Sequence, residues 1–390
     1  MSEIKKLIER LCPDGVEFRE LGKVCEMQRG TSMTKKNAIE GDIPVISGGR
    51  EPAFYINTAN REGETITVAG SGAGAGYVQY WNEPIFVNDA FSVKGTDTLL
   101  TKYVFYCMKN MQKKITETQK GGGVPHVHIS SIENFEIPIP PLEVQRKIVE
   151  ILDHFTELEA ELEAELEARR KQYEYYRNAL LSFDKVGGVR FDVEWKTLGE
   201  IGTMTKGSGI QKSDFVEDGY PCIHYGQLHT YFGTFASKNK SYISKELYDR
   251  CKKAVYGDLI IATTSEDVEA CCKATAWLGG EVAISGDAHI FHHNQNPKYV
   301  AYFFQTDSFA KQKRKYASGV KVVRVNGDSL AKILIPLPPL SEQQRIVGIL
   351  DRFEALTTDL QSGLPAEIAA RRKQYEYYRE KLLTFKRKTA

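Results

Sequence analysis

Two stretches of the chain carry apolar residues at the spacing of a long amphipathic helix. From Ile148 onward, nine of eleven positions in the a and d series are apolar or aromatic, which is typical of a helix that packs along one stripe. The second stretch, from Ile346 onward, has four more residues than the first. Its a and d series keeps to apolar positions only if it advances by four residues at Leu364. Such a step unwinds a helix pair locally. Because Gly363 and Pro365 fall at the same point, we expect a kink or short break there.

Each helix follows a Pro-Pro pair and, at about 40 residues, would be roughly 60 Å long if straight. The helices could pack on their own globular domains or on each other, and the matching stripes favour an antiparallel pair about an approximate two-fold axis. Glu159, Arg169 and Arg371 interrupt the stripes and could either set the register or lie at frayed or solvated positions. The residues expected in the helix-helix seam are Ile148, Leu152, Phe155, Leu162, Tyr173 and Tyr176 in the first helix, and Ile346, Leu350, Phe353, Leu360, Tyr375 and Tyr378 in the second.

The rest of the chain has short β-like runs between turns, at 66–70, 84–93, 258–263 and 281–291. Helical patterns are few there and lie mainly at 99–115 and 297–315. This mixture predicts α+β globular domains with mixed or antiparallel sheets.

The chain also contains an internal repeat. IPIPPLEVQRKIVEILDHF at 137–155 returns as IPLPPLSEQQRIVGILDRF at 335–353, and ARRKQYEYYR occurs at both 168–177 and 370–379. Because a repeat constrains the whole architecture, we expect two globular domains separated by the two long antiparallel helices, with pseudo-two-fold symmetry. The predicted boundaries are 1–136 for the first globular domain, 137–183 for the first helical spacer, 184–334 for the second globular domain and 335–390 for the second spacer.

Between these repeated segments the two globular halves diverge. VEFRELGKV and VEWKTLGEI align near their starts, but GSGAGAG at 70–76 lies opposite TTSEDVEACC at 263–272. Divergent loops on a copied scaffold indicate that each half recognises something different.

Positive and negative charges are balanced, with a formal net charge of +1. The four predicted segments carry −1, −4, +3 and +3, so none is a polycation, and counterion release alone would not give tight binding to nucleic acid. Any DNA contact would need help from a partner. Seven cysteines without a C-x-x-C pair fit a reducing compartment. Since the sequence has no apolar run of about 18 residues, we expect a cytoplasmic protein without membrane contact.

Motifs for catalysis and cofactor binding are missing from the sequence. The glycines at 70–76 do not fit G-x-G-x-x-G, and the sequence has no G-x-x-x-x-G-K-[ST] or [ND]-P-P-[YF] segment, so a flexible surface loop is favoured over a phosphate cradle. His126 with His128, and Cys271 with Cys272, lack the further residues of a metal site. We expect no catalytic residue, metal or cofactor on this chain.

Two aligned loops combine a basic residue, glycine, small hydroxyl residues and lysine: QRGTSMTKKN at 28–37 and TKGSGIQKSD at 205–214. This mixture suits contacts to phosphates and base edges, with an ordinary solvated turn as the alternative. The run KQKRKY at 311–316 is either a solvated helix face or a phosphate-binding stripe. Arg50 would suit guanine and Gln227 adenine. The candidate DNA-binding residues are Arg29, Thr31, Ser32, Lys35, Lys36, Ser47, Arg50, Ser71, Lys206, Ser208, Gln211, Lys212, His224, Tyr225, Gln227, Lys313, Arg314, Lys315, Lys321 and Arg324.

The paired helix-start motifs, the paired ARRKQYEYYR segments and the opening CPDGVEFRELGKV together resemble the specificity subunit of type I restriction-modification enzymes, over essentially the whole chain. The first motif departs slightly at 143–145, where EVQ stands opposite the SEQ of 341–343. The resemblance implies two target-recognition domains, each binding one half of a split, asymmetric sequence in double-stranded DNA. It further implies helices that set the gap between the halves and dock two methyltransferase subunits, which methylate adenine N6.

On this resemblance, S-adenosylmethionine, ATP and magnesium belong to partner subunits, and motor-nuclease subunits join through the methyltransferase subunits. This chain itself would be non-catalytic. The main alternative is a stand-alone bipartite DNA-binding regulator without enzymatic partners. A chain with its own methyltransferase region is disfavoured by the length, and a scaffold without a nucleic-acid role is disfavoured by the divergent loops.

Overall fold

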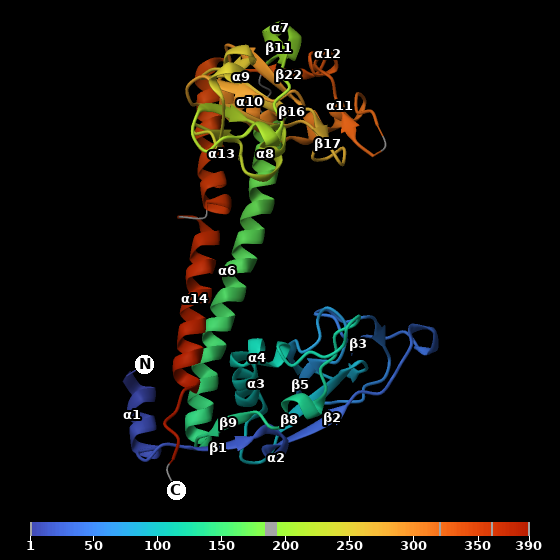
Figure 1. Cartoon of the computed structure of the whole chain (residues 1–390), viewed down its shortest axis with the longest axis vertical. Coiled ribbons are helices and arrows are strands. Elements are labelled where there is room, and N and C mark those ends of the chain that lie inside the picture. Colours follow the sequence, from blue (N-terminus) through green and yellow to red (C-terminus); the bar gives the residue numbers. More distant parts are fainter. Residues whose placement is uncertain (1, 184–192, 320, 360–361, 389–390) are drawn as a thin grey trace. The chain divides into compact units, whose positions relative to one another are not determined.

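The computed structural model describes residues 2–183, 193–319, 321–359 and 362–388. The chain forms two compact units (Figure 1): unit 1 comprises Met1–Glu163 and Glu367–Ala390, and unit 2 comprises Ala164–Ala366. The long helix α6 (Leu142–Ser182) contributes residues 142–163 to unit 1 and 164–182 to unit 2. Each unit therefore contains one globular domain and parts of the long helices.

The main sheet of unit 1 is antiparallel, in the order β2 (Cys25–Arg29), β8 (Ala90–Gly95), β5 (Glu64–Ala69) and β6 (Val78–Asn82). A smaller mixed sheet has the order β4 (Tyr55–Ile56), β3 (Ile43–Ile46) and β7 (Phe86–Val87), and β1 (Glu17–Glu20) pairs with β9 (Glu136–Ile139). The helical segments besides α6 are α1 (Ser2–Leu11), α2 (Leu21–Val24), η1 (Lys35–Asn37), α3 (Thr101–Asn110), α4 (Gln112–Thr116), α5 (Ile129–Ile132) and most of α14 (Leu364–Leu383).

Unit 2 repeats this plan with additions. Its main sheet has the order β11 (Gly202–Lys206), β20 (Ala288–His293), β16 (Leu259–Ala262), β18 (Lys273–Trp277) and β13 (Phe235–Ala236). A second sheet has the order β14 (Ser241–Ile243), β12 (Tyr220–Ile223), β19 (Val282–Ile284) and β15 (Lys253–Ala254), while β17 (Thr264–Ser265) pairs with β21 (Val323–Arg324) and β10 (Glu194–Thr197) with β22 (Leu334–Leu337). The helical segments are α7 (Leu198–Ile201), η2 (Lys212–Asp214), α8 (Tyr225–Thr230), α9 (Lys245–Arg250), α10 (Pro297–Phe303), α11 (Asp307–Arg314), α12 (Gly327–Leu330) and α13 (Leu340–Thr358). The predicted α+β class with mixed and antiparallel sheets is confirmed.

The runs at 84–93 and 281–291 were each expected to be one strand, and each is two. In unit 1 the chain leaves β7 of the small sheet at Val87 and enters β8 of the main sheet at Ala90. In unit 2 it leaves β19 at Ile284 and enters β20 at Ala288. Both crossings carry the aspartates of the aligned NDAF and GDAH segments, so the interruption is part of the repeat.

A matched set of polar contacts attaches each long helix to its own globular domain. Lys102 on α3 pairs with Asp153 on α6 at 2.8 Å, and Lys298 on α10 pairs with Asp351 on α13 at 2.8 Å. The Tyr103 hydroxyl donates to the Pro138 carbonyl at 3.1 Å, as the Tyr299 hydroxyl does to Pro336 at 2.8 Å. These tyrosines are fully buried, and because burial disfavours the phenolate it raises the pKa of both.

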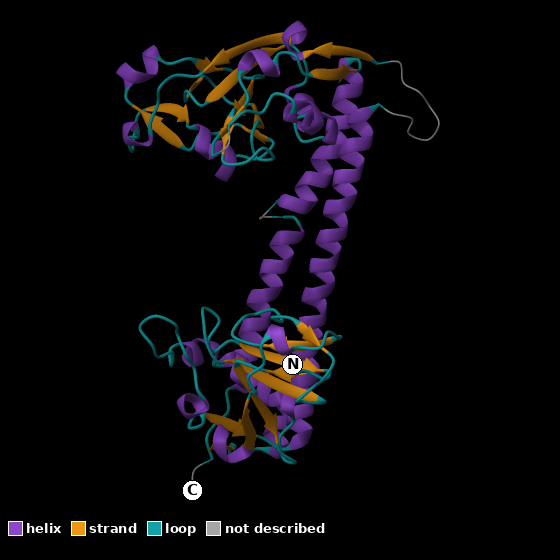
Figure 2. Ribbon diagram, turned by 90° about the vertical axis from the view of Figure 1, so that its right-hand side faces the viewer, coloured by secondary structure: helices purple, strands orange, loops and turns teal. Residues whose placement is uncertain are grey.

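The long helices also pair with each other, as Figure 2 shows for the segments within each unit. In unit 1, Phe155 of α6 stacks on Tyr378 of α14 with ring centroids 5.4 Å apart. Further along, Glu159 and Glu163 of α6 bind Arg372 of α14. Later residues of α6 thus face earlier residues of α14, so the predicted antiparallel pairing is confirmed in this unit. In unit 2, Tyr173 and Tyr176 of α6 stack on Phe353 of α13, at 6.4 and 5.5 Å.

The expected seam residues are mostly buried or half-buried. Ile148, Leu152, Ile346 and Leu350 have exposures of 1% or less, whereas Tyr176 stacks on its partner but remains 40% exposed. Half-buried positions are Phe155, Leu162, Phe353, Tyr375 and Tyr378, Tyr173 is buried, and Leu360 lies outside the described residues.

One of the three polar residues in the stripes joins the two helices. Glu159 pairs with Arg372 across the helix pair, as a residue that sets the register would, while Arg371 binds Glu367 on its own helix. Arg169 likewise binds Glu165 and Gln172 within α6. The cross-helix contact in this stretch is therefore one arginine between two glutamates of α6.

The second long helix is interrupted at the four-residue step, as expected. Helix α13 ends at Thr358 and α14 begins at Leu364. Gly363 is buried at this junction, and a Cβ there would lie 2.5 Å from the Ala355 carbonyl oxygen. Glycine is needed here because the end of α13 approaches its backbone closely.

Candidate nucleic-acid interface

The two loops predicted to contact DNA lie at equivalent places in the two units. Each begins where the edge strand of the main sheet ends, β2 in unit 1 and β11 in unit 2. The Gly30 amide donates to the Ala90 carbonyl at 2.9 Å, and the Gly207 amide donates to the Ala288 carbonyl at 2.9 Å. A Cβ at either glycine would lie 2.1–2.2 Å from a carbonyl oxygen, that of Asn88 or Ser285. Close backbone approach therefore explains why both loops need glycine at this point.

A second matched set of hydrogen bonds holds the loops beside these glycines. In unit 1, the Gly70 amide donates to Asp89 at 3.0 Å and its carbonyl accepts from Val127 at 3.0 Å. In unit 2, Thr263 takes the place of Gly70. Its amide donates to the Asp287 carbonyl at 3.1 Å, and its carbonyl accepts from the Val325 amide at 3.1 Å. These backbone hydrogen bonds, at Gly30 and Gly70 in unit 1 and at Gly207 and Thr263 in unit 2, are called the backbone frame below. The frame is the same in both units although the side chains differ.

The backbone frame of each unit includes an aspartate whose carboxylate accepts a hydrogen bond from a hydroxyl side chain. The Ser71 hydroxyl donates to the Asp89 carboxylate in unit 1, and the Thr264 hydroxyl donates to the Asp287 carboxylate at 3.4 Å in unit 2. Each aspartate retains capacity to accept further hydrogen bonds, and Asp89 is exposed whereas Asp287 is half-buried. These aspartates were not among the predicted residues, although the aligned NDAF and GDAH segments marked them.

A short hairpin lies next to this pair in each unit. In unit 1, Lys120 and His126 exchange backbone hydrogen bonds of 2.9 and 2.8 Å, and His126 also bridges to Ser71. In unit 2, Ser318 and Arg324 exchange bonds of 3.0 and 2.8 Å, and Arg324 pairs with Thr264. Gly121 and Gly319 open the two turns with φ of +117° and +104°. The hairpins are equivalent. Lys321 and Arg324 of the second were among the predicted DNA-binding residues, whereas no residue of the first was, because its GGGVP loop has no charged residue.

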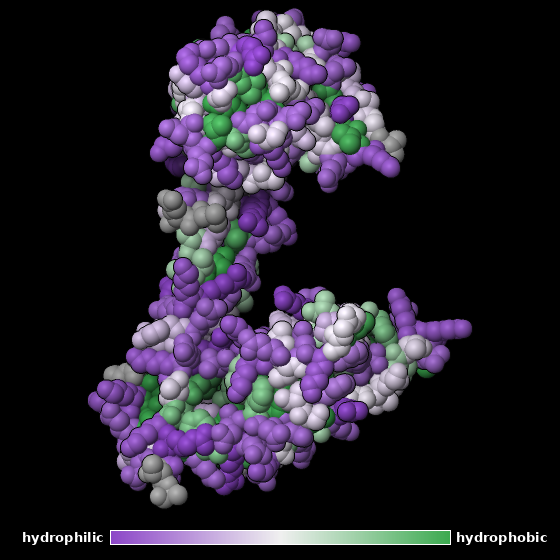
Figure 3. All heavy atoms as spheres, in the orientation of Figure 1, coloured by the Kyte–Doolittle hydropathy of each residue, from purple (hydrophilic) through white to green (hydrophobic). Residues whose placement is uncertain are grey.

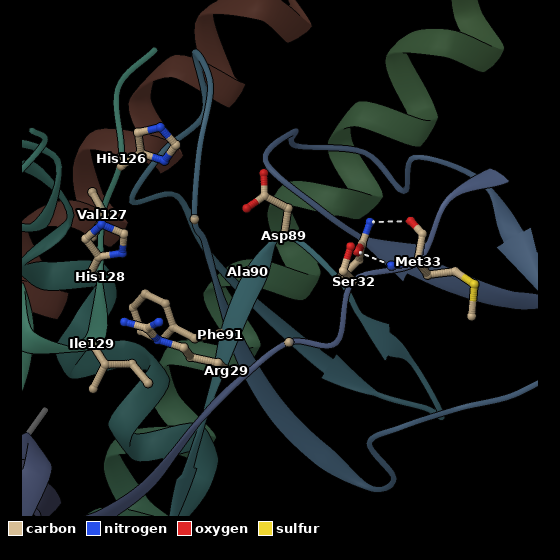
Figure 4. Close-up of a pocket in the computed structure, with 13 residues that line it drawn as sticks. Arg29, Ser32, Met33, Asp89, Ala90, Phe91, His126, Val127, His128 and Ile129 are labelled. Carbon is tan, nitrogen blue, oxygen red and sulfur yellow. Dashed lines mark hydrogen bonds between the residues drawn. The ribbon is translucent and has the colours of Figure 1, made fainter. Parts of the chain in front are cut away.

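A cavity of about 500 Å³ in unit 1 collects several of these groups. Figure 4 shows the imidazoles of His126 and His128 on one side of their segment, with Arg29 and Asp89 also lining the cavity. The two imidazole rings stack at 6.0 Å with an interplanar angle of 8°, so they lie on the same face of the segment. Donors and acceptors on an exposed, concave surface of this kind suit base edges and phosphates.

Asn88 fixes the predicted loop of unit 1 over this cavity. Its side-chain oxygen accepts from the Met33 amide at 2.8 Å, and its side-chain nitrogen donates to the Met33 carbonyl at 3.2 Å and to Ser47 at 3.0 Å. The loop is therefore positioned by side-chain contacts and is more than a solvated turn.

The structure places the predicted residues of unit 1 as follows. Exposed residues are Arg29, Thr31, Ser32, Lys35, Lys36 and Arg50, while Ser47 and Ser71 are half-buried. Arg29 and Ser32 line the cavity, and the Arg50 guanidinium lies 5.0 Å from the centre of the Tyr77 ring. Contact of these residues with DNA stays a prediction.

Several predicted residues of unit 2 have structural partners. His224, 8% exposed, precedes α8 and accepts from the Gly226 amide at 3.2 Å, and burial lowers its pKa. Gln227 accepts from the His224 amide and donates to Ser241, and Ser208 accepts from the Lys252 amide. The side-chain groups of these three residues hold the fold. Lys206, Gln211 and Lys212 are exposed and Tyr225 is half-buried.

The basic run at 311–316 does not form a continuous stripe. Lys313 is 4% exposed, and its ammonium donates to the carbonyls of Glu269 at 3.0 Å and Cys271 at 2.9 Å, so it is not available to a phosphate in this fold. Arg314 pairs with Glu269 at 2.6 Å. Lys315, Lys321 and Arg324 are exposed.

The segment at 70–76 is also different from the expected flexible loop. Ala75 and Gly76 are buried. The Gly72 amide donates to the Pro125 carbonyl at 3.0 Å, and the Ala75 amide donates to the Gly72 carbonyl at 3.0 Å. Its glycines allow a compact turn with φ of +78° at Gly72 and +82° at Gly76. The segment packs against the hairpin and supports it.

The surface in Figure 3 is predominantly hydrophilic on both units, with smaller apolar patches. None of the helices in the described ranges combines the length with the apolar character that a membrane span requires. Groups of three or more His, Cys, Asp or Glu side chains placed to hold a metal are likewise absent from the part of the chain that the structure describes.

Comparisons with known proteins agree with one another. The family model of the type I restriction modification DNA specificity domain matches residues 13–168 and 192–370. The chain is 32% identical to a putative type I restriction enzyme specificity subunit of Haemophilus influenzae, covering 99% of this chain and 100% of that protein. It is also 32% identical to the EcoR124I/EcoR124II specificity subunit of Escherichia coli, covering 99% and 98%.

Solved structures show the same fold. The S subunit of a type I restriction-modification system from M. genitalium superposes with a TM-score of 0.59 at 17% identity, covering 95% of this chain and 96% of that chain. A chain from work on complex assembly and conformational transition of the type I R-M system gives a TM-score of 0.62 at 18% identity, covering 95% and 97%.

Proposed function

The chain belongs to the specificity subunits of type I restriction-modification enzymes, and from this premise we propose that it binds double-stranded DNA and that each unit reads one half of a bipartite, asymmetric target. The proposal rests mainly on one observation. The same backbone frame occurs in both units around Gly30 and Gly207, but it presents different side chains. A shared scaffold with different surface groups is what two unlike half-sites require.

The long helices act as the spacer and as the docking surface for two methyltransferase subunits. Helix α6 is continuous over 41 residues, about 60 Å of helix, and it contributes to both units. Each globular domain is attached to its helix by matched ion pairs and buried tyrosines, so a change in helix length would pass to the domain as a rigid displacement.

Catalysis belongs to the partners in this proposal. The methyltransferase subunits bind S-adenosylmethionine and methylate adenine N6, and the motor-nuclease subunits, which use ATP and magnesium, join through them. This chain determines where the duplex is held. Adenine must leave the base stack to be methylated, and that step falls to the methyltransferase subunits.

The modest charge of the chain fits such a division of work. With a formal net charge of +1, phosphate contacts of this chain alone would be few. Two half-site contacts on one spacer raise each other's effective concentration, so neither contact needs to be strong, and the partners contribute further phosphate contacts.

The test is to map methylated bases in host DNA with and without the gene for this chain, the partner genes being retained. The proposal predicts methylated adenines in a split, asymmetric motif that disappear when the gene is removed. An unchanged methylation pattern would contradict it. A stand-alone regulator would instead leave methylation intact and bind its site after purification without partners.

A further inference from the structure

The equivalent hairpins of the two units place different residues at one position. His126 in unit 1 and Arg324 in unit 2 each close a hairpin through two backbone hydrogen bonds, to Lys120 and to Ser318. Each also lies opposite the hydroxyl residue that binds the aspartate of its own unit: Ser71, which binds Asp89, or Thr264, which binds Asp287. The residue after each pair, Val127 or Val325, bonds to the equivalent carbonyl of Gly70 or Thr263. The two positions are therefore the same site in the repeated frame.

The frame holds this position by its backbone and leaves its side chain exposed. Both His126 and Arg324 are exposed. The bonds that fix them use the backbone amide and carbonyl, which any residue other than proline supplies. Among the described residues, the Arg324 guanidinium has no hydrogen-bond or ion-pair partner, unlike the neighbouring Arg314, which binds Glu269. Its donors remain available to a ligand.

The chemistry of the two side chains differs in the way that base recognition exploits. Arginine presents a planar fork that binds the O6 and N7 acceptors of guanine with two hydrogen bonds. A neutral histidine offers one N–H donor and one acceptor nitrogen, and it has no such fork. The adjacent aspartate can accept from a cytosine amino group. A hairpin end beside an aspartate thus offers both a donor and an acceptor to a base pair.

We propose that the side chain at this position is a specificity-determining contact in each unit, with Arg324 reading a guanine in the half-site of unit 2 and His126 making the corresponding contact in unit 1. This deepens the proposed function and rests on it. The exposed Lys321, in the turn of the same hairpin, contacts phosphate and carries no base preference.

The test uses the complete system in its host, with methylated bases mapped by sequencing. Arg324→Ala should relax one guanine position in one half of the motif, so that discrimination at that position falls roughly ten- to a hundredfold, while the other half is unchanged. Arg324→Lys keeps the charge but loses the fork and should relax the same position. His126→Arg should alter the preference at one position in the opposite half.

Lys321→Ala is the matched control, because it removes one positive charge from the same hairpin. It should lower methylation uniformly across sites and leave the motif intact. An unchanged motif in Arg324→Ala and His126→Arg, or relaxation of both halves together, would overturn the inference. Complete loss of methylation in both Arg324 variants, with Lys321→Ala still active, would also overturn it, since the residue would then act on the fold or on general binding.

The same maps separate this inference from the function on which it rests. If the unmodified chain gives no split motif, the proposed function itself fails. If the split motif is present and the variants leave it unchanged, the proposed function stands and the assignment of this position fails.

Discussion

Two buried glutamines hold the starts of the long helices to their globular domains. Gln145 accepts from the Leu100 amide and donates to the carbonyls of Thr98 and Pro140, over 2.8–3.0 Å. Gln343 accepts from the Asn296 amide and donates to Gln295 and to the Pro338 carbonyl, over 2.8–3.0 Å. Both side chains are fully buried, and each satisfies one buried carbonyl, that of Pro140 or Pro338.

Replacing either glutamine by leucine should therefore be costly. Gln343→Leu leaves the buried Pro338 carbonyl and the half-buried Asn296 amide without their partner and should lower the free energy of unfolding by roughly 2–4 kcal/mol, as should Gln145→Leu. The neighbouring Gln344 is exposed and makes one side-chain contact, to Asn296, so Gln344→Leu should change stability by less than about 0.5 kcal/mol. Urea unfolding of the three variants tests this, and equal effects at 343 and 344 would contradict it.

The pH dependence of stability should reflect the half-buried His293. Burial lowers the pKa of His293 to about 4, and its Nε2 is buried without a hydrogen-bond partner among the described residues. Below its unfolded pKa of about 6.5, the unfolded chain binds a proton that the folded chain does not. The free energy of unfolding should therefore fall as the pH drops from about 6.5 to about 4, with this residue contributing on the order of 2 kcal/mol.

His293→Asn should remove part of this fall, and the exposed His154 provides the control in His154→Asn. The measurement is the urea midpoint at pH 7.5 and pH 5 for each variant. A pH difference that is the same in the His293 variant and the unmodified chain would refute the assignment.

Not every residue role could be read from the sequence. The run at 311–316 contains no apolar stripe, so it does not show which of its faces is covered. Lys313 follows the buried Phe309 by four residues, which places the two on the same helix face, and this spacing was the available signal. His224 and Gln227 were chosen for their chemistry, but helix capping and hydrogen bonding to Ser241 use that same chemistry.

At the scale of the elements, the heptad pattern and the four-residue step located the long helices and the break between α13 and α14. They succeeded because stripe periodicity reports directly on packing. Strand patterns were less complete: the runs at 84–93 and 281–291 appear continuous in sequence, yet each crosses between two sheets. Where the chain passes from one sheet to another, apolar residues stand both before and after the passage. The sequence pattern therefore does not show to which sheet each of them belongs.

Replacing glycine by alanine should change the free energy of unfolding in opposite directions at two positions, one at the break and one within α13. Gly363→Ala should destabilise the chain by roughly 1–3 kcal/mol, because the Cβ meets carbonyl oxygens at 2.5–2.8 Å. Gly348, within α13, has open space around its Cβ position, so Gly348→Ala should stabilise by roughly 0.5–1 kcal/mol. Thermal unfolding of the two variants decides this, and a stabilised Gly363→Ala would show that the junction does not need glycine.

At the scale of the whole molecule, the length of the paired helices should determine the gap in the DNA target. Adding one heptad to α6 within 160–167, with a matching heptad in α14, adds about 10 Å of helix, or about three base pairs. The methylated motif should keep both halves and gain a longer gap. A motif with its original gap would exclude the helices as the spacer.

The internal repeat, with its two globular domains and two helices, could be predicted at this scale because repeated letters reveal it directly. The bases that each unit reads could not, since they depend on the side chains that the hairpins and loops bring together. His126, for example, meets Ser71 through a bridge between segments far apart in the sequence.

The central claim is that each unit reads its own half-site, and exchanging one domain tests it most directly. The register of β1 with β9 matches that of β10 with β22, with Glu17 opposite Ile139 and Glu194 opposite Leu337. Replacing residues 17–139 by residues 194–337 therefore gives a chain with two copies of the second domain. We predict that this chain directs methylation to a split palindrome built from the unit 2 half-site. Methylation of the original asymmetric motif by this chain would contradict the account.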